Sequence, residues 1–270
     1  MRLRILGSSS AGNSTLVWTD RSALLVDCGF SPRYLLKQLS SLGVSLPSLG
    51  GLVITHAHGD HVRDEAIALL LENRVPVYVR HELAGVLTRM YPSLARASRL
   101  GMLREFDGQG AAVGSFEVDA FPVPHDSPGG CFGFSVSAGT GGARRRMTFA
   151  TDLGFIPAGL EERFRDSDAI VIESNHDAGM LENSGRPPWL KKRIQEIGHL
   201  SNDQCAAFVS GVVRSSASPP RGVVLAHLSQ QCNTPRLAED ATREALRAGG
   251  CADVAVLPSF RSAPSGILEF

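Results

Sequence analysis

The segment VITHAHGDHVRD, residues 53–64, constrains the fold of this chain more than any other. Within six residues it places four side chains that can bind a metal ion, namely His56, His58, Asp60 and His61. The apolar run 51–55 before them is typical of a buried strand, and the run 62–73 after them is typical of a helix. The potential ligands therefore stand at a strand-to-helix junction.

The spacing of these side chains favours metal binding over an ordinary hydrogen-bonding role. Residues i and i+2 of an extended segment point the same way, so His56 and His58 can grip one ion. Asp60 and His61 begin the following turn and can face a second ion beside it. Imidazole and carboxylate suit Zn, Mn or Fe, and the absence of thiolate argues against a purely structural zinc site. A lone histidine would fit a capping role, but the complete H-x-H-x-D-H pattern predicts a metal site.

Composition excludes several classes of protein. The 27 Lys and Arg residues balance 27 Asp and Glu residues, which gives no support for bulk attraction to nucleic acid or membrane. The five cysteines form no C-x-x-C pair, which argues against a disulfide scaffold and favours a reducing compartment. The N-terminal apolar stretch is too short for a signal peptide, and no apolar run reaches membrane-spanning length. These features predict a cytoplasmic protein with no membrane partner.

Strand and helix patterns run through the whole chain. Runs rich in Val, Ile, Leu and Phe predict strands at 2–6, 15–18, 23–26, 51–55, 75–79, 116–123, 132–137, 147–151, 169–173, 222–226 and 254–257. Apolar periodicity predicts helices at 62–73, 82–90, 188–197, 202–213 and 235–248. A further helix is expected after Ser31, with Pro32 in its first turn and Gly43 at its stop. Hairpin-linked and helix-linked strands mix without a linker, which predicts one α/β domain over residues 1–270.

Two ions need more ligands than the opening motif supplies, and further ligands are expected at strand ends. His125 follows FEVDAFPVP, Asp152 follows MTFAT, and His227 follows GVVLA. Each residue alone could be a turn residue, a helix cap or a loop histidine. Their shared position after an apolar run favours a common site.

The motif THAHGDH with these later residues resembles the metallo-β-lactamase superfamily, over essentially the whole chain. The resemblance implies an α/β fold, a four-layer αβ/βα sandwich of two mixed β-sheets flanked by helices. It implies two divalent metal ions, Zn, Mn or Fe, held by two sets of ligands: His56, His58 and His125 for one ion, and Asp60, His61 and His227 for the other, with Asp152 as the bridge. Asp27 in LLVDCG resembles the early aspartate motif of the family and would orient the ligand loop.

Further motifs narrow the branch. His58 argues against the oxygen-reducing diiron branch, and Asp152 in place of a thiolate argues against antibiotic-hydrolysing lactamases. The stretch EIGHLSNDQCAAFV, residues 196–209, resembles the HST…A element of tRNase Z-type phosphodiesterases, whose His serves the leaving group. GSSSAGNST, VIESNHD, WLKKRIQEIGHLSN and LAHLSQQCN together resemble the YycJ/WalJ branch of single-strand-directed 5′ exonucleases linked to DNA repair. Cys232 departs from that pattern, since an Asn is expected before Asn233.

The resemblance therefore implies a dinuclear phosphodiesterase, a 5′ exonuclease acting on single-stranded DNA. Asp60 would orient the attacking water, and His199 would protonate the leaving sugar oxygen. His199 could instead only fix the start of the helix 202–213. The alternative is a small-molecule hydrolase of the same fold, either a cyclic-phosphate phosphodiesterase or a glyoxalase II/lactonase-like acyl hydrolase, which the neutral net charge mildly favours. A metal-stabilised binding module without turnover fits the complete ligand set poorly.

Other residues are candidates for substrate contact or for support of the ligands. Four of them follow or precede predicted elements near the motifs: Asn175, His176, Ser201 and Asn202. The stretch 7–14 could bind a phosphate or simply be a turn between strands. Lys191–Arg193 precedes His199 and could contact phosphates, whereas Arg144–Arg146 fits a solvated hairpin edge better. The sequence leaves the metal identity, the polarity of digestion, partner proteins and the oligomeric state open.

Overall fold

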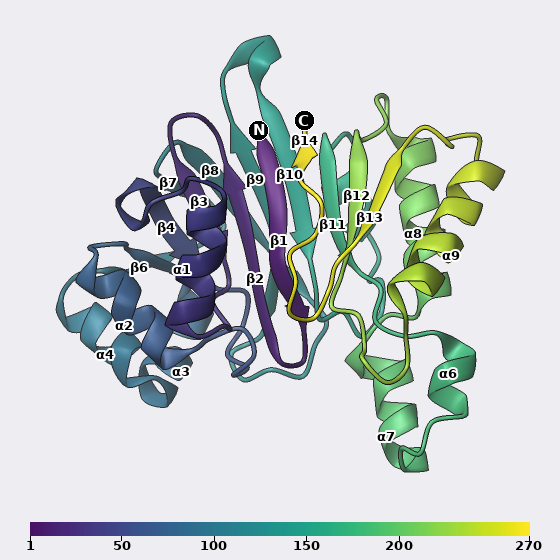
Figure 1. Ribbon diagram of the computed structural model, residues 1–270, viewed down its shortest axis with the longest axis horizontal. Helices are drawn as coiled ribbons and strands as arrows, with labels where there is room; N and C mark the ends of the chain where they lie inside the picture. The colour runs from purple at the N-terminus through teal and green to yellow at the C-terminus, as the bar shows by residue number, and fades with distance from the viewer.

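Two mixed β-sheets pack face to face and carry helices on their outer faces (Figure 1). The structure is a computed structural model that describes residues 1–270. The strand order is β14-β1-β2-β3-β4-β5-β6 in the first sheet and β13-β12-β11-β10-β9-β8-β7 in the second. The predicted αβ/βα sandwich is thereby confirmed. No helix combines the length and the apolar character needed to span a bilayer.

The first sheet is built from the N-terminal half of the chain and closed by the C-terminal strand. Its strands are β1 (Arg2–Ser9), β2 (Gly12–Trp18), β3 (Ala23–Val26), β4 (Leu49–Val53), β5 (Val77–Arg80), β6 (Leu103–Phe106) and β14 (Leu268–Glu269). The pairs β1–β2 and β2–β3 are antiparallel, and β3 to β6 run parallel. The helices on the left of Figure 1 are α1 (Pro32–Ser41), α2 (Asp64–Glu72), α3 (His81–Met90) and α4 (Pro92–Arg99).

The second sheet is built from the C-terminal half. Its strands are β7 (Ala111–Val113), β8 (Phe116–Val123), β9 (Cys131–Ala138), β10 (Arg145–Ala150), β11 (Ala169–Glu173), β12 (Gly222–Ala226) and β13 (Ala255–Pro258). Strands β7 to β10 are antiparallel, and β10 to β13 are parallel. Its helices are α5 (Leu160–Phe164), α6 (Ala178–Glu182), α7 (Pro188–Arg193), α8 (Asn202–Ser215) and α9 (Pro235–Ala248). Helices α6 and α7 stand out from the body at the lower right of Figure 1.

Alternation along the parallel strands explains how the second sheet holds two apolar layers. In β11, Ala169 and Val171 face the core between the sheets, whereas Ile170 and Ile172 face the layer under α8. Successive strand residues point to opposite faces, so a strand covered on both sides must be apolar throughout. All five residues of β11 are buried, and the last of them is Glu173. A carboxylate at the end of such a strand therefore lies inside the molecule.

A capping box fixes the start of α8 close to the metal-binding motif. The Ser201 side chain accepts a hydrogen bond from the Gln204 backbone N–H at 3.2 Å, and the Gln204 side chain accepts one from the Ser201 N–H at 2.8 Å. Such a box satisfies two donors that the first helical turn leaves free. It also holds the chain just after His199 in one position.

Candidate metal centre

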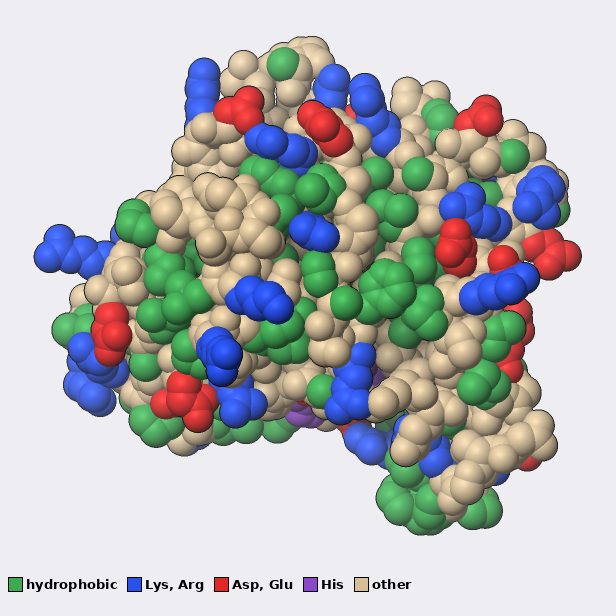
Figure 2. All heavy atoms as spheres, in the orientation of Figure 1, with side chains coloured by type: hydrophobic (Ala, Val, Ile, Leu, Met, Phe, Trp, Pro, Cys, Tyr) green, Lys and Arg blue, Asp and Glu red, His purple; other side chains and the backbone are tan.

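The strand ends predicted to carry metal ligands converge at one edge of the two sheets. The loop after β4 carries the motif from His56 to His61, and the loops after β8, β10 and β12 carry His125, Asp152 and His227. Histidine side chains are visible at the lower edge of the space-filling view (Figure 2). Parallel strands end at the same edge of a sheet, which is why loops distant in sequence meet there.

The structure brings all of the predicted ligands into mutual contact distance. Their possible ligand atoms fall into groups lying within 4.8 Å of one another, namely His56, His58 and His125; Asp60, His61 and His227; His56, His61 and Asp152; and a fourth group, Asp152, Glu173, His199 and His227, which adds two residues outside the predicted ligand set. One oxygen of Asp152 lies 3.2 Å from His61 Nε2, and the other lies 3.8 Å from His125 Nε2. Asp152 therefore reaches both sets of histidines.

Asp27 orients His61 from behind. Its Oδ2 lies 2.7 Å from His61 Nδ1 and accepts a hydrogen bond from Thr55 Oγ1 at 2.8 Å. Its Oδ1 accepts a hydrogen bond from the Thr55 backbone N–H at 2.9 Å. With Nδ1 of His61 engaged by a buried carboxylate, its Nε2 is left to face the centre, the usual arrangement of a ligating histidine.

Glu173 orients two histidines in the same way. It was not among the site residues predicted from the sequence. Its Oε1 lies 2.7 Å from His227 Nδ1 and 2.9 Å from His199 Nδ1. Its Oε2 accepts hydrogen bonds from the backbone N–H groups of Leu153 at 2.8 Å and Leu200 at 3.2 Å. A fully buried carboxylate needs such partners, so the acid that ends the apolar run AIVIE was the signal in the sequence.

Asn13 is a second residue that the sequence analysis did not single out. Its backbone N–H donates to the Asp60 carbonyl oxygen at 2.7 Å, and its Nδ2 donates to Asp60 Oδ2 at 3.2 Å. The same Nδ2 lies 2.9 Å from His61 Nε2. Gly29 packs against the same peptide, because a Cβ there would meet the Asp60 carbonyl oxygen at 1.8 Å. The turn carrying Asp60 is thus held from two sides.

Backbone strain is concentrated at this edge of the sheets. Five non-glycine residues have a positive φ angle, and three of them, Asp27, Asp152 and His227, belong to this centre with φ of 60°, 58° and 55°. The left-handed region costs free energy for residues with a Cβ, and such residues persist where the surroundings dictate the conformation. Each of the three follows the end of its strand: Asp152 and His227 bring their side chains to the cluster, and Asp27 contacts His61 on the side away from it.

The buried carboxylates at the centre favour binding of a cation. None of the buried or half-buried carboxylates here pairs with Lys or Arg; their only ion-pair partners are histidines. Burial disfavours ionised Asp152, yet the His227 and His61 imidazoles outweigh it and hold the pKa of the carboxyl well below its usual range. Burial likewise lowers the pKa of His227, but Asp152, Asp60 and Glu173 raise it to about 10. Burial also lowers the pKa of His61, but Asp152 and Asp27 raise it in the same way, so the negative charge of these carboxylates favours a positive charge beside them.

Two buried ligand atoms have no hydrogen-bond partner, as a metal site requires. They are Asp152 Oδ2 and His227 Nε2. Buried polar atoms are almost always hydrogen-bonded. Two buried atoms without a partner, within a cluster of imidazoles and carboxylates, therefore fit the role of metal ligands. The donor set contains nitrogen and oxygen only, which suits Zn, Mn or Fe.

A cavity of about 190 Å³ opens onto this cluster. His58, Asp60, His125, Asp152, His199 and His227 all line it. Asp60 is the more accessible of the two carboxylates among the predicted ligands, with 23% of its side chain exposed, compared with 3% for Asp152. A substrate entering the cavity would therefore meet the ligands, Asp60 and His199 together.

The remaining predicted site residues, Asn175, His176, Ser201 and Asn202, lie outside the metal cavity. The Asn175 Nδ2 donates to the His227 carbonyl oxygen at 2.7 Å, which supports the ligand loop. Asn202 bonds to Ser174 and Asn233 inside the protein, and Ser201 caps α8. None of these three side chains lines the metal cavity. His176 lines a neighbouring cavity.

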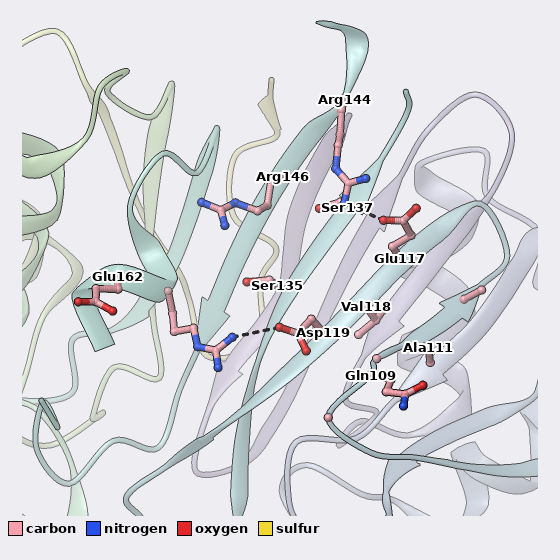
Figure 3. A pocket seen from close by; sticks show the side chains of 14 residues that line it. Gln109, Ala111, Glu117, Val118, Asp119, Ser135, Ser137, Arg144, Arg146 and Glu162 are labelled. Carbon is pink, nitrogen blue, oxygen red and sulfur yellow. Dashed lines mark hydrogen bonds and ion pairs between the residues drawn. The ribbon is translucent and has the colours of Figure 1, made fainter. Parts of the chain in front are cut away.

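A larger cavity of about 620 Å³ lies at the opposite end of the second sheet (Figure 3). It opens beside the start of β8, whereas the predicted ligand His125 follows the end of that strand. Two of its arginines are already neutralised, Arg144 by Glu117 at 2.7 Å and Arg163 by Asp119 at 3.2 Å. The stretch Arg144–Arg146 is therefore part of an ion-paired outer sheet face, remote from the metal centre.

Comparison with known proteins agrees with the architecture of this site. The β-lactamase superfamily domain matches residues 23–228. The chain is 27% identical to the exodeoxyribonuclease YycJ of Bacillus anthracis over 257 residues, covering 93% of this chain and 90% of that protein. It is 27% identical to the exodeoxyribonuclease WalJ of Streptococcus pneumoniae over 242 residues, covering 87% and 84%.

Solved structures share the fold at low sequence identity. Zn²⁺-bound PqqB from Methylobacterium extorquens superposes with a TM-score of 0.67 at 16% identity, with all of both chains covered. The metallo-β-lactamase fold protein YhfI from Bacillus subtilis gives a TM-score of 0.65 at 15% identity, with 99% of both chains covered. The family match, the two exodeoxyribonuclease relatives and the cluster of side chains that could bind metal lead to one conclusion. This chain belongs to the metallo-β-lactamase superfamily, in its YycJ/WalJ branch, and is a metal-dependent hydrolase.

Proposed function

We propose that this protein is a dinuclear metal-dependent phosphodiesterase that digests single-stranded DNA from its 5′ end. The observation that carries the proposal is the convergence of the ligand cluster and His199 on one cavity. The exodeoxyribonuclease relatives support a nucleic acid substrate. The alignment with YycJ covers 93% of this chain. Cytoplasmic location and a single domain over residues 1–270 stay predictions.

Two sets of ligands would hold the ions. His56, His58 and His125 form one set, and Asp60, His61 and His227 form the other. Asp152 would serve both, because its two oxygens lie toward His61 and His125. When bound, two divalent cations supply a Lewis acid for the phosphoryl oxygens and a lowered pKa for the attacking water.

The residues of the chain have distinct tasks in the proposed reaction. Asp60 would accept a hydrogen bond from the attacking water and aim its oxygen at phosphorus. The new bond joins that oxygen to phosphorus, the water releases one of its protons to the solvent, and the bond from phosphorus to the sugar oxygen breaks. His199 would give its proton to that sugar oxygen through Nε2, because its Nδ1 is held by Glu173 at 2.9 Å. Glu173 fixes the orientation of the ring, so that Nε2 can face the sugar oxygen.

Glu173→Gln is expected to weaken metal binding about 10- to 100-fold, as loss of a group that orients a ligating histidine does. The glutamate accepts from two imidazoles with one oxygen and from two backbone N–H groups with the other. A glutamine has a single acceptor oxygen, so one of these pairs is left without a partner. Metal titration of the variant would measure the change.

The exposed Glu162→Gln, on the short helix α5, is the matched control and should bind metal as the wild type does. A lower Tm for Glu173→Gln with unchanged metal affinity would show that Glu173 only stabilises the fold.

The substrate is tested with end-labelled oligonucleotides. Single strands with a free 5′ end should be shortened faster than duplexes or strands blocked at that end, and the rate should fall with salt, because phosphates must be held by positive charge. Arg193 and Lys192 lie on the chain leading to His199, although Arg193 is paired with Asp126 and Lys192 with Glu196. Rapid thioester turnover of S-lactoylglutathione, with no digestion of DNA under any divalent metal, would favour the acyl hydrolase instead.

A further inference from the structure

A second cavity of about 170 Å³ adjoins the metal cavity. The two share Ser10, Arg193, Ile194 and His199 in their walls. His199 therefore stands at the boundary, with the metal ligands on one side and the second cavity on the other. A molecule in contact with His199 from the metal side can extend past it into the second cavity.

The second cavity contains a positive charge without a partner. Arg186, in the loop between α6 and α7, lines it and forms no ion pair, and its Nε is buried without a hydrogen-bond partner. Arg193 in the shared wall differs, because Asp126 neutralises it and the two form a hydrogen-bonded ion pair. A buried guanidinium nitrogen without an acceptor is costly, and a phosphate or carboxylate is its natural partner.

His176 supplies a second unpartnered group in the same wall. Its side chain is 2% exposed, and its Nδ1 is buried without a hydrogen-bond partner. Burial lowers the pKa of His176 to about 4, so the imidazole is neutral and can donate one N–H. The rest of the wall includes Leu181, Leu190 and Ile194, which suits a sugar better than a further charge.

We infer that this second cavity binds the 5′-terminal phosphate of the DNA strand through Arg186 and His176. The inference rests on the proposed function, which fixes the direction of the substrate. When phosphorus is attacked and His199 protonates the leaving oxygen, the leaving sugar lies on the His199 side. For digestion from the 5′ end, that oxygen is the 3′ oxygen of the terminal nucleotide, whose other phosphate is the 5′ one. The terminal nucleotide therefore extends past His199 toward Arg186.

The cavity would make the enzyme selective for 5′-phosphorylated ends. Wild-type protein should digest a 5′-phosphorylated oligonucleotide at least about tenfold faster, in kcat/KM, than the same strand with a 5′-hydroxyl, since the phosphate gains charge-assisted hydrogen bonds. Arg186→Gln should remove this preference and leave the 5′-hydroxyl rate within about twofold of wild type. Arg186→Lys should restore part of it. Arg247→Gln, an exposed position in the last turn of α9, is the control of equal charge change.

Calorimetry tests the cavity independently of DNA digestion. Metal-loaded wild type should bind thymidine 3′,5′-bisphosphate about tenfold more tightly than thymidine 3′-monophosphate, and Arg186→Gln should bind the two alike. If the wild type digests no oligonucleotide yet keeps this difference, the exonuclease proposal fails and the phosphate site stands. If it digests DNA from 5′-phosphate and 5′-hydroxyl ends alike and binds both nucleotides equally, the phosphate site is overturned and the exonuclease stands. An equal loss on both kinds of end in Arg186→Gln would mean that Arg186 holds an internal phosphate, which also overturns the inference.

Discussion

Asp152→Ala is expected to loosen both of the proposed metal ions and to slow hydrolysis of every substrate by about 10³-fold or more, since metal ions contribute several kcal/mol to such reactions. Asp152 is 2% exposed, and its two oxygens face histidines of both ligand sets. Its side chain is therefore expected to bridge the ions. Removal of the carboxylate also takes away one of the negative charges that face His61 and His227.

Elemental analysis after desalting would measure the metal content of Asp152→Ala. His58→Ala is the informative comparison, because His58 belongs to one ligand set only and should empty or weaken one position. Asp119→Ala, in the remote groove of Figure 3, should keep both metals and full activity. Two tightly bound metals in Asp152→Ala would refute the bridging role.

That the proposed metal ligands would lie together could be predicted from the sequence, because these residues follow apolar strands. His125, Asp152 and His227 are separated by long stretches of chain, but parallel and hairpin strands return to the same edge of the sheets. The pattern of apolar runs also located the principal strands of both sheets. Those runs are long or strongly apolar, and burial on the inner face imposes that composition.

Short elements were not predicted, because their contacts are made by tertiary packing. The strand β7, Ala111–Val113, has only one fully buried side chain, Val113, and pairs with β8 across a hairpin. The helix predicted at 62–73 starts at Asp64, because Val62 forms a bridge with Cys28 and remains extended. Periodicity in the sequence does not reveal a bridge to a distant strand end.

The supporting groups of the site were harder to identify than the ligands. Glu173 is the last residue of an apolar strand, whereas the predicted ligands follow their strands. Its role depends on contacts with two histidines that are distant from it in the sequence. Arg186 lies in a loop with no pattern around it, and only the absence of an acidic partner distinguishes it.

His199→Ala is expected to slow DNA hydrolysis by about 10²–10⁴-fold, the usual contribution of a general acid, and to slow bis(p-nitrophenyl) phosphate hydrolysis far less. A sugar alkoxide leaves poorly without a proton, whereas p-nitrophenolate scarcely needs one. The geometry suits this role, since Glu173 holds Nδ1 and the ring lines the cavity beside the ligands. Metal content should stay unchanged, because His199 lies outside both proposed ligand sets.

The competing role for His199 is purely structural, at the chain segment that leads into α8. The capping box of Ser201 and Gln204 fixes that helix without the His199 side chain, which points instead to Glu173. A structural role predicts equal losses on the two substrates together with a lower Tm, and loss of one metal would make His199 a ligand. His81→Ala, an exposed histidine paired with Glu105, controls for removal of an imidazole. Only a proton donor makes the loss depend on the leaving group, so the ratio of the two rates decides between these roles.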